Sequence, residues 1–406
     1  MLNWVNRFNI FSFLDNQGYP QFFSDTECLV GAGVQHATHQ SASLDELKQF
    51  NSLHDDWKFG HLSYELKNEI EGLQSERASE LDFQNLFFFV PQVILRLSNT
   101  KLSIGILEQD PNRIFDEINS CAEQFQFKSV NASIQSRFSR DEYIASVEML
   151  KQHILRGDCY EINFCQEFFI EQLSLDPVAV YCSLMKASPN PFSALYRNDD
   201  QWLLCASPER YIKRAGNRIY SQPIKGTSPR NIDPQKDEQN RNELLANAKE
   251  RSENVMVVDL VRNDLSKICE EGSVHVDELF GIYSFPQVHQ MISTVVGVVD
   301  PAIDFVDIVK ATFPMGSMTG APKVRVMELI EQYERSKRGI FSGALGYVEP
   351  GEDFDFNVII RSLMYNAGTG YLSFQTGSAI TFQSNSASEY EECLLKAEAI
   401  KKVLTG

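Results

Sequence analysis

Short runs of apolar residues in the first third of the chain predict strands. Residues 28–33, 86–90 and 101–107 are rich in β-branched, aromatic and other apolar side chains and are separated by turn residues. Residues 63–83 are polar with spaced apolar positions, which favours a helix, and Asp110-Pro111 is a start signal for another helix that reaches about residue 125. This part of the chain is therefore expected to be a set of strands with two helices.

From residue 141 the predicted elements become longer. Helical spacing of apolar positions, with start signals such as Asp176-Pro177, predicts helices over residues 141–156, from 176 onward, and over 233–267, 319–335 and 388–403. Alternating or continuous apolar runs predict strands over residues 160–170, 191–206 (as a pair), 288–299, 341–348, 354–365 and 370–375.

The order of these elements predicts the fold class. Helices and strands mix without a strict strand–helix–strand rhythm, which favours an α+β fold with large antiparallel sheets layered with helices over a doubly wound parallel sheet. The polar, serine-rich residues 126–140 are the expected connector. We expect one fold over residues 1–406, with an N-terminal part (1–135) and a catalytic part (136–406).

Composition and charge exclude several classes of protein. The chain is 43% hydrophobic with 28 Phe, enough for a large core. Its longest apolar stretch, residues 86–97, is too short to span a bilayer, and no charged-then-apolar leader opens the chain. A net charge of −18 disfavours nucleic acid as a partner. Eight Cys without a CxxC pair indicate reduced thiols, so we expect a cytoplasmic protein.

Acidic residues at helical spacing are candidates for a metal site. In the last predicted helix Ser388 and Glu391 form a capping-box pattern, and Glu389, Glu392 and Lys396 share one face. Glu250 and Glu253 have the same spacing in the long helical segment, and two facing pairs of carboxylates suit Mg²⁺. The spacing alone is weak, because roughly seven acid-x-x-acid pairs are expected by chance in this composition.

Three loops rich in small residues are candidates for binding an anion. Residues 315–323 lead into a helix, residues 376–379 precede the last helix, and residues 223–227 place Lys225 in a turn. Each is also compatible with an ordinary turn. The chain has no GxSxG, Walker, HExxH or GxGxxG motif, which excludes the common hydrolase, nucleotidase, zinc-protease and dinucleotide-binding classes.

Taken together, these segments resemble the chorismate-utilising enzymes, a family that includes the large subunits of anthranilate synthase and aminodeoxychorismate synthase and the isochorismate and salicylate synthases. The resemblance runs from about residue 140 to the C-terminus, and the matching segments are residues 157–163, 207–210, 223–227, 253–264, 316–323 and 389–396. The chain departs from the family pattern at two places. At residue 161 it has Glu where the family has Gln, and at Ala379 and residues 381–383 the family has small and acidic residues instead.

Within the family, residues 223–227 separate two branches. The sequence Pro-Ile-Lys-Gly-Thr is similar to the aminodeoxychorismate-forming branch, whereas anthranilate synthases have Ala at the position of Lys225. Residues 316–323 also resemble that branch, and the first hundred residues show no Leu-Leu-Glu-Ser stretch of the tryptophan-inhibited members. Anthranilate synthase stays the second alternative, and a non-catalytic, chorismate-binding regulatory subunit is a third, which would lack the acids or the lysine.

The resemblance implies a reaction and the residues for it. Chorismate and ammonia would give 4-amino-4-deoxychorismate, on the route to 4-aminobenzoate and folate. Mg²⁺ would be held directly by Glu253 and Glu392 and through water by Glu250 and Glu389, with Lys396 and Gly377 nearby. Further substrate-binding residues would be Arg361, Tyr347, Thr227 and Ser317, with Arg361 and Tyr347 on the enolpyruvyl carboxylate.

The resemblance also implies the catalytic residues and a partner. Lys225 would attack the ring as a neutral amine, in a pocket that lowers its pKa, and Glu209 would protonate the departing hydroxyl. His289 would be the pocket histidine of the family, with a purely structural histidine as the alternative. No Cys lies in a GxCxG elbow, so a separate glutamine amidotransferase subunit is expected to supply ammonia.

Overall fold

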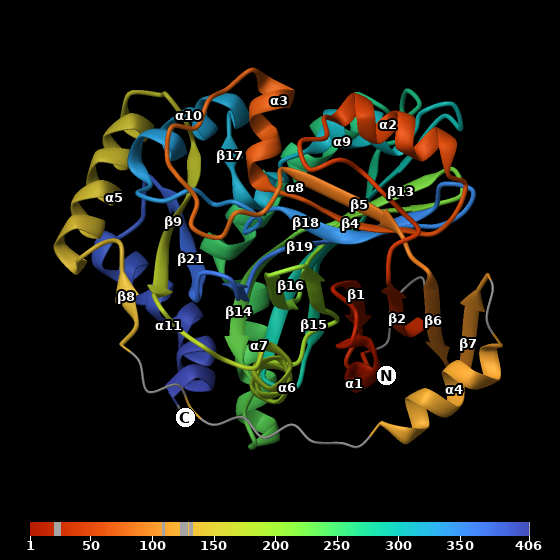
Figure 1. Ribbon diagram of the computed structural model, residues 1–406. Coiled ribbons are helices and arrows are strands. Elements are labelled where there is room, and N and C mark those ends of the chain that lie inside the picture. The colour runs from red at the N-terminus through yellow and green to blue at the C-terminus, as the bar shows by residue number, and fades with distance from the viewer. Residues whose placement is uncertain (20–25, 108–109, 122–128, 130–132, 406) are drawn as a thin grey trace.

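Two antiparallel sheets form the centre of the protein, as the computed structural model shows (Figure 1). The structure describes residues 1–19, 26–107, 110–121, 129 and 133–405, so residues 126–128 and 130–132 of the predicted connector lie outside the described residues. Within that part of the chain, sheet I has 11 strands and sheet II has 10. The predicted α+β class with large antiparallel sheets is confirmed.

Sheet I runs in the order β17-β9-β21-β20-β11-β10-β1-β2-β6-β7, with β8 paired to β9. Its strands are β1 (Ile10–Asp15), β2 (Thr26–Ala32), β6 (Val93–Ser98), β7 (Lys101–Ile106), β8 (Gln135–Ser136), β9 (Glu161–Ile170), β10 (Phe192–Asn198), β11 (Gln201–Ser207), β17 (Gly320–Ala321), β20 (Ser362–Asn366) and β21 (Tyr371–Thr381).

Sheet II runs in the order β14-β16-β13-β12-β19-β18-β4-β5-β3, with β15 paired to β16. Its strands are β3 (His36–Ala37), β4 (Lys58–Leu62), β5 (Leu86–Val90), β12 (Arg210–Ala215), β13 (Arg218–Gln222), β14 (Ile224–Pro229), β15 (His275–Ser284), β16 (Val288–Val298), β18 (Ala344–Val348) and β19 (Phe354–Val358). Both sheets contain strands from before and after residue 135, so the two predicted parts share one architecture.

The helices pack around the two sheets. They are α1 (Leu2–Val5), α2 (Leu44–Leu53), α3 (Lys67–Glu71), α4 (Pro111–Ser120), α5 (Arg140–Leu155), α6 (Pro177–Ala187), α7 (Pro234–Ala246), α8 (Ala248–Ser266), α9 (Phe305–Thr312), α10 (Lys323–Tyr333) and α11 (Ser386–Thr405), with short 3₁₀ turns η1 (Tyr64–Leu66) and η2 (Gly316–Met318). Within the described ranges, no helix is both long and apolar enough to cross a membrane.

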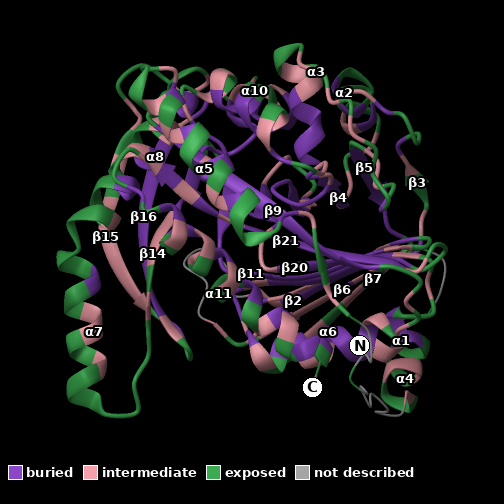
Figure 2. Cartoon of the chain, turned by 90° about the vertical axis from the view of Figure 1, so that its left-hand side faces the viewer, coloured by how far each residue is buried: buried purple, intermediate pink, exposed green. Residues whose placement is uncertain are grey.

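The core lies between the sheets and under the helices. Ala194 and Leu203 of sheet I belong to one buried cluster with Phe59 and Phe356 of sheet II, which fixes one sheet on the other. A second cluster joins sheet I to helices that include α5, α6 and α11. Figure 2 shows the strands largely buried and α7 largely exposed. The strands and helices of both sheets are therefore held in place by these two buried clusters.

Three predicted elements have different limits, each for a local physical reason. The helix predicted over residues 63–83 ends at Gly72, whose left-handed φ of 66° terminates α3. The segment 233–267 is two helices, because Asn247 is extended and its side chain accepts from the amides of Lys249 and Glu250 as a new N-cap. The strand predicted over residues 354–365 is interrupted at Arg361, which has a φ of 51°.

The N-terminus of the last helix also differs from the prediction. The capping box predicted at Ser388 and Glu391 is wrong, because the helix starts earlier, at Ser386. The side chain of Asn385 accepts a hydrogen bond from the amide of Ser388 at 3.0 Å and so takes the capping role. Ser388 lies inside the first turn, and the helix begins two residues earlier than its sequence pattern suggests.

Candidate active site

A buried ion pair links the two sheets at Lys225. Lys225 is the second residue of β14 in sheet II, and Glu161 is the first residue of β9 in sheet I. The Nζ atom of Lys225 donates to Oε1 of Glu161 at 2.8 Å, and their side chains are 11% and 2% exposed. Lys225 therefore points between the sheets and not to water, as expected for a functional lysine.

The surroundings of Lys225 differ from the expectation that its pKa is lowered. Burial on its own lowers the pKa of this amine, but the carboxylates of Glu161, Glu253 and Glu209 outweigh burial and raise the pKa above its ordinary value. The prediction of a depressed pKa is therefore wrong for the protein without a ligand. In that state Lys225 is a charged ammonium group among acids.

Glu209 lies next to Lys225 in the short connection between β11 and β12. Its amide donates to Oγ of Ser207 at 3.2 Å, and its carbonyl accepts from the amide of Val358 at 3.0 Å, so the backbone is fixed on both sides. Burial raises the pKa of Glu209 to about 7, although Ser317, Lys225, the Ile224 amide and Arg361 act in the opposite direction. A carboxyl group with this pKa can both hold and release a proton near neutral pH.

The same neighbours show which predicted residues come together. Arg361 is close enough to Glu209 for each to shift the pKa of the other, and burial lowers the pKa of Arg361. Ser317, in the turn η2, is 7% exposed, and its carbonyl accepts from Nδ2 of Asn163 on β9 at 2.9 Å. Lys225, Glu209, Arg361 and Ser317 thus form one group between the sheets.

Four carboxylates from two helices form an adjoining acidic cluster. Glu250 and Glu253 lie on α8, which packs on β14 and β16, and Glu389 and Glu392 lie on α11, which packs on β21. The Nζ atom of Lys249 lies 3.4 Å from Oε1 of Glu389 and 3.7 Å from Oε1 of Glu253. Lys249 therefore lies between α8 and α11 and contacts acids of both helices. The two predicted pairs of glutamates do face each other.

The electrostatics of this cluster suit a bound cation. Burial raises the pKa of Glu253 to about 7 and also raises that of Glu250, although Lys225 and Lys249 act in the opposite direction. The charged form of these two acids is therefore disfavoured in the absence of a bound cation. Oε1 of Glu253 and Oε2 of Glu389 are buried and have no hydrogen-bond partner among the described residues. The Oε1 atom of Glu253 has Nζ of Lys249 at 3.7 Å, which is too far for a hydrogen bond. Buried carboxylate oxygens without a hydrogen bond suit Mg²⁺ as ligands.

The cluster is not, however, a closed metal cage. Across the described ranges, no group of three or more His, Cys, Asp or Glu side chains is placed to hold an ion by itself. Glu392 is 42% exposed and pairs with Lys396 at 2.8 Å, and this lysine outweighs burial and lowers the pKa of Glu392. Mg²⁺ commonly takes one or two protein carboxylates and keeps several waters, so an open acidic cluster of this kind fits the ion. Among the described residues, the cluster's buried oxygens without a hydrogen bond belong to Glu253 and Glu389.

Gly377 and Lys396 lie together beside this cluster. Nζ of Lys396 donates to the carbonyl oxygen of Gly377 at 2.9 Å. A Cβ atom at residue 377 would lie 2.3 Å from the carbonyl oxygen of Phe164 on β9, so only glycine fits here. The close approach of β21 to β9 therefore depends on this residue.

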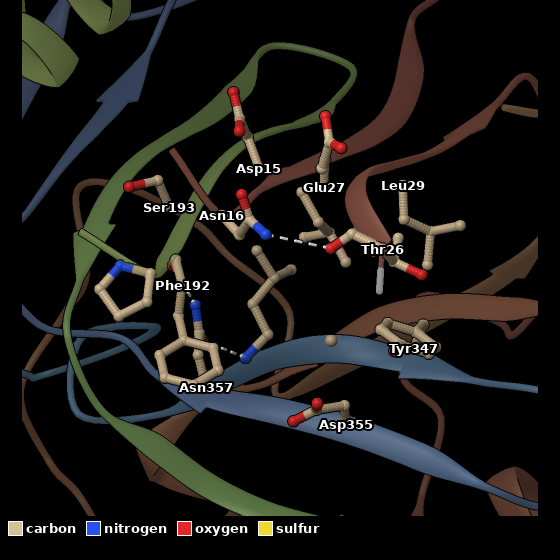
Figure 3. A pocket seen from close by; sticks show the side chains of 14 residues that line it. Asp15, Asn16, Thr26, Glu27, Leu29, Phe192, Ser193, Tyr347, Asp355 and Asn357 are labelled. Atoms are coloured by element: carbon tan, nitrogen blue, oxygen red, sulfur yellow. Dashed lines mark hydrogen bonds between the residues drawn. The ribbon is translucent and has the colours of Figure 1, made fainter. Parts of the chain in front are cut away.

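Tyr347 is not part of this group, contrary to the prediction. It lies on β18 across from Asp355, and its ring contacts those of Trp57 and Phe59 at centroid distances of 5.6 and 6.2 Å. Figure 3 shows it lining a separate pocket with Asp15, Asn16, Thr26, Glu27, Leu29, Phe192, Ser193, Asp355 and Asn357. Arg361 and Tyr347 therefore do not meet on one ligand group.

His289 lies on β16, across from Ser228 of β14. Its Nδ1 lies 2.8 Å from Oγ of Ser284 and its Nε2 lies 3.1 Å from Oδ1 of Asp237, so both ring nitrogens are engaged. These contacts fit the structural alternative for His289, and its role as a pocket histidine stays a prediction. Thr227, predicted to bind substrate, is exposed and lies across from Gln290 in the β14–β16 ladder.

Two residues that sequence reasoning did not select belong to the site. They are Glu161 and Lys249, which make the ion pairs described above. In the sequence, Glu161 stood out only as a departure from the family pattern, and Lys249 carried no signal.

Comparison with known proteins gives a consistent result. Residues 14–402 match the family of chorismate binding enzymes. An anthranilate synthase component I-like protein of Synechocystis is 35% identical over 361 residues, which cover 87% of this chain and 73% of that protein. Aminodeoxychorismate synthase component 1 of Bacillus subtilis is 31% identical over 360 residues, covering 85% and 76%.

A solved structure shows the same fold. Anthranilate synthase component I of Streptococcus pneumoniae superposes with a TM-score of 0.79 at 24% identity, covering 97% of this chain and 92% of that one. At this identity the likeness concerns the fold alone.

Proposed function

The chain belongs to the chorismate-binding enzyme family, and on this basis we propose that it is the large subunit of an aminodeoxychorismate synthase. It would convert chorismate and ammonia to 4-amino-4-deoxychorismate, on the route to 4-aminobenzoate and folate. Two relatives, from Bacillus subtilis and Escherichia coli, are named aminodeoxychorismate synthase component 1, which supports this activity. The words "component 1" also support the proposal that the chain works with a second subunit.

One observation carries the choice within the family. Lys225 stands where the anthranilate synthases have alanine, and its amine is buried beside Glu209 and Glu161 and not in solvent. A lysine at this place can form a covalent bond to the substrate ring, which an alanine cannot. The geometry therefore supports a route through a lysine adduct.

The residues present offer a receptor for each carboxylate of chorismate. Arg361 presents a guanidinium group next to Glu209 and fits one carboxylate with its planar fork. We assign Mg²⁺ to the acidic cluster, with Glu253 and Glu392 as direct ligands and Glu250 and Glu389 as ligands through water. When bound, the ion would neutralise the second carboxylate and the surplus charge of the cluster.

The proposed chemistry divides the proton transfers between two side chains. Glu209 in its protonated form gives its proton to the departing 4-hydroxyl, which leaves as water. Lys225 gives one ammonium proton to solvent and, as a neutral amine, forms the bond from Nζ to the ring as the C–O bond breaks. Ammonia then forms its bond to the ring as the bond to Nζ breaks; its extra proton returns to Lys225, and Glu209 regains its proton from solvent. Because its pKa is raised, Lys225 is protonated before substrate binds. It must therefore lose a proton during the reaction.

The pKa of Glu209 predicts a pH dependence. A general acid must be protonated, and with a pKa of about 7 the protonated fraction of Glu209 falls as the pH rises above neutral. Lys225 must also lose a proton, and its neutral fraction rises with pH because its pKa is raised. The two effects offset each other above neutral pH, so the kcat/KM for chorismate should rise up to about pH 7 and then level off. The Glu209→Gln variant should be slower by about 10²-fold or more, and its kcat/KM should keep rising above pH 7. A variant that levels off at the same pH as the wild type would assign the break to another group.

The choice of nitrogen source tests the assignment of a partner. With chorismate and MgCl₂, the purified chain should consume chorismate when ammonium is added and should not do so with glutamine. The reason is that none of its eight Cys lies in a GxCxG elbow. Removal of the metal with a chelator should stop the reaction. Efficient use of glutamine by the purified chain would contradict a separate glutaminase subunit.

Anthranilate synthase is the second candidate, because relatives with that name match at similar identity. The component 1 of Haloferax volcanii is 35% identical over 315 residues. That enzyme class forms anthranilate with loss of pyruvate, so the product distinguishes the two candidates. A non-catalytic subunit ranks lower, since the lysine and all four acids are present.

A further inference from the structure

Glu161 is a buried acid whose contacts are those of a site residue. It opens β9, is 2% exposed, and its Oε1 accepts from Lys225 at 2.8 Å. Its other oxygen, Oε2, is buried and has no hydrogen-bond partner among the described residues. An unsatisfied buried carboxylate oxygen is costly, so the fold has no structural reason to keep it.

A second buried glutamate on the same strand shows the contrast. Glu167 is 4% exposed, and both of its oxygens are bonded: Oε2 accepts from Nε of Arg137 and Oε1 from the hydroxyl of Tyr371, each at 2.9 Å. That is the pattern of an acid in a structural network. Glu161 differs, because among the described residues its Oε1 accepts from Lys225 and its Oε2 has no hydrogen-bond partner.

We propose that Glu161 is a positioning residue, whose Oε1 holds the amine of Lys225 in the direction from which it attacks the substrate. This inference rests on the proposed function. Lysine has a long, flexible stem, and β14 fixes only its backbone, so the amine needs a second anchor from the opposite sheet. Glu161 supplies that anchor from β9.

The role requires a hydrogen-bond acceptor at the right distance and not a negative charge. The family pattern has Gln at this position, and its amide oxygen can accept from an ammonium group as a carboxylate does. Glu161→Gln should therefore keep the role. Glu161→Asp withdraws the acceptor by one methylene group, and Glu161→Leu removes it.

The experiment compares these variants in ammonium-dependent consumption of chorismate. Glu161→Leu should lower kcat by about 10²-fold, with the KM for chorismate within about threefold, because misplacing the amine affects the reaction more than binding. Glu161→Asp should lower kcat by about tenfold and Glu161→Gln by less than about fivefold. The amount of chorismate adduct on Lys225, trapped without ammonium, should follow the same order.

Glu167→Leu is the matched control, since it removes a buried acid from the same strand. It should lower the melting temperature but leave kcat per folded enzyme within about twofold. Wild-type kcat in the Asp or Leu variant, or equal losses in the Gln and Leu variants, would overturn the positioning role. If Leu prevents folding, the comparison of Asp with Gln decides. An inactive wild-type chain would instead contradict the proposed function.

Discussion

Replacing Lys225 by glutamine should reduce the amination of chorismate by about 10³-fold or more, because the covalent route is lost. Glutamine keeps a polar group that can meet Glu161, whereas alanine would leave this buried acid without its partner and could destabilise the fold by about 3–5 kcal/mol. The melting temperature and kcat should therefore be measured on both variants. Residual turnover is expected, since Glu209 can still assist the leaving hydroxyl.

The adduct itself provides the second readout of this prediction. Wild-type enzyme mixed with chorismate and MgCl₂ but no ammonium, and then denatured, should carry the ring on the peptide that contains Lys225. The Lys225→Gln variant should carry none. A glutamine variant that retains the wild-type rate would remove the lysine route and favour anthranilate synthase.

Replacing Glu253 by glutamine should abolish turnover, with a loss of about 10³-fold or more, and should weaken Mg²⁺ binding in a calorimetric titration. Glu392→Gln should do the same if both are direct ligands. Neither change should unfold the protein. Burial raises the pKa of Glu253, so its charge is disfavoured in the metal-free fold, and the neutral amide should keep or raise the melting temperature.

Glu391→Gln is the matched control for the metal prediction. It is a glutamate on the same helix, next to Glu392, but its side chain is 63% exposed and its nearest cationic group is Nε of Arg140 at 3.8 Å. Its activity and Mg²⁺ affinity should stay within about twofold of wild type. Full activity of Glu253→Gln at saturating Mg²⁺ would exclude the proposed ligand set.

Local sequence signals predicted the elements that depend on local physics. The spacing of apolar positions predicts the helix over residues 141–156, and the structure adds a capping box of Ser139 and Glu142 at its N-terminus. The alternation of residues 160–170 predicts β9. The break at Asn247 was missed because the same residue ends one helix and caps the next, and the pattern on either side is helical. At the last helix a plausible cap at Ser388 competed with the actual one at Asn385.

The sequence predicted several residues of the site but not which of them contact each other. The resemblance selected Lys225 and Glu209, and the structure places them together. The partner of Lys225, Glu161, is 64 residues away in the chain and lies in the other sheet, so no local pattern could reveal their contact. The resemblance also selected His289 and Tyr347. In the structure His289 contacts Asp237, and Tyr347 lies across from Asp355 and lines a different pocket.

Identification of the product tests the central claim most directly. The purified chain should be incubated with chorismate, MgCl₂ and ammonium chloride, and the products separated and identified by mass and absorbance. The account predicts 4-amino-4-deoxychorismate, in which the amino group replaces the hydroxyl and the enolpyruvyl group remains. Anthranilate together with an equal amount of pyruvate would contradict it.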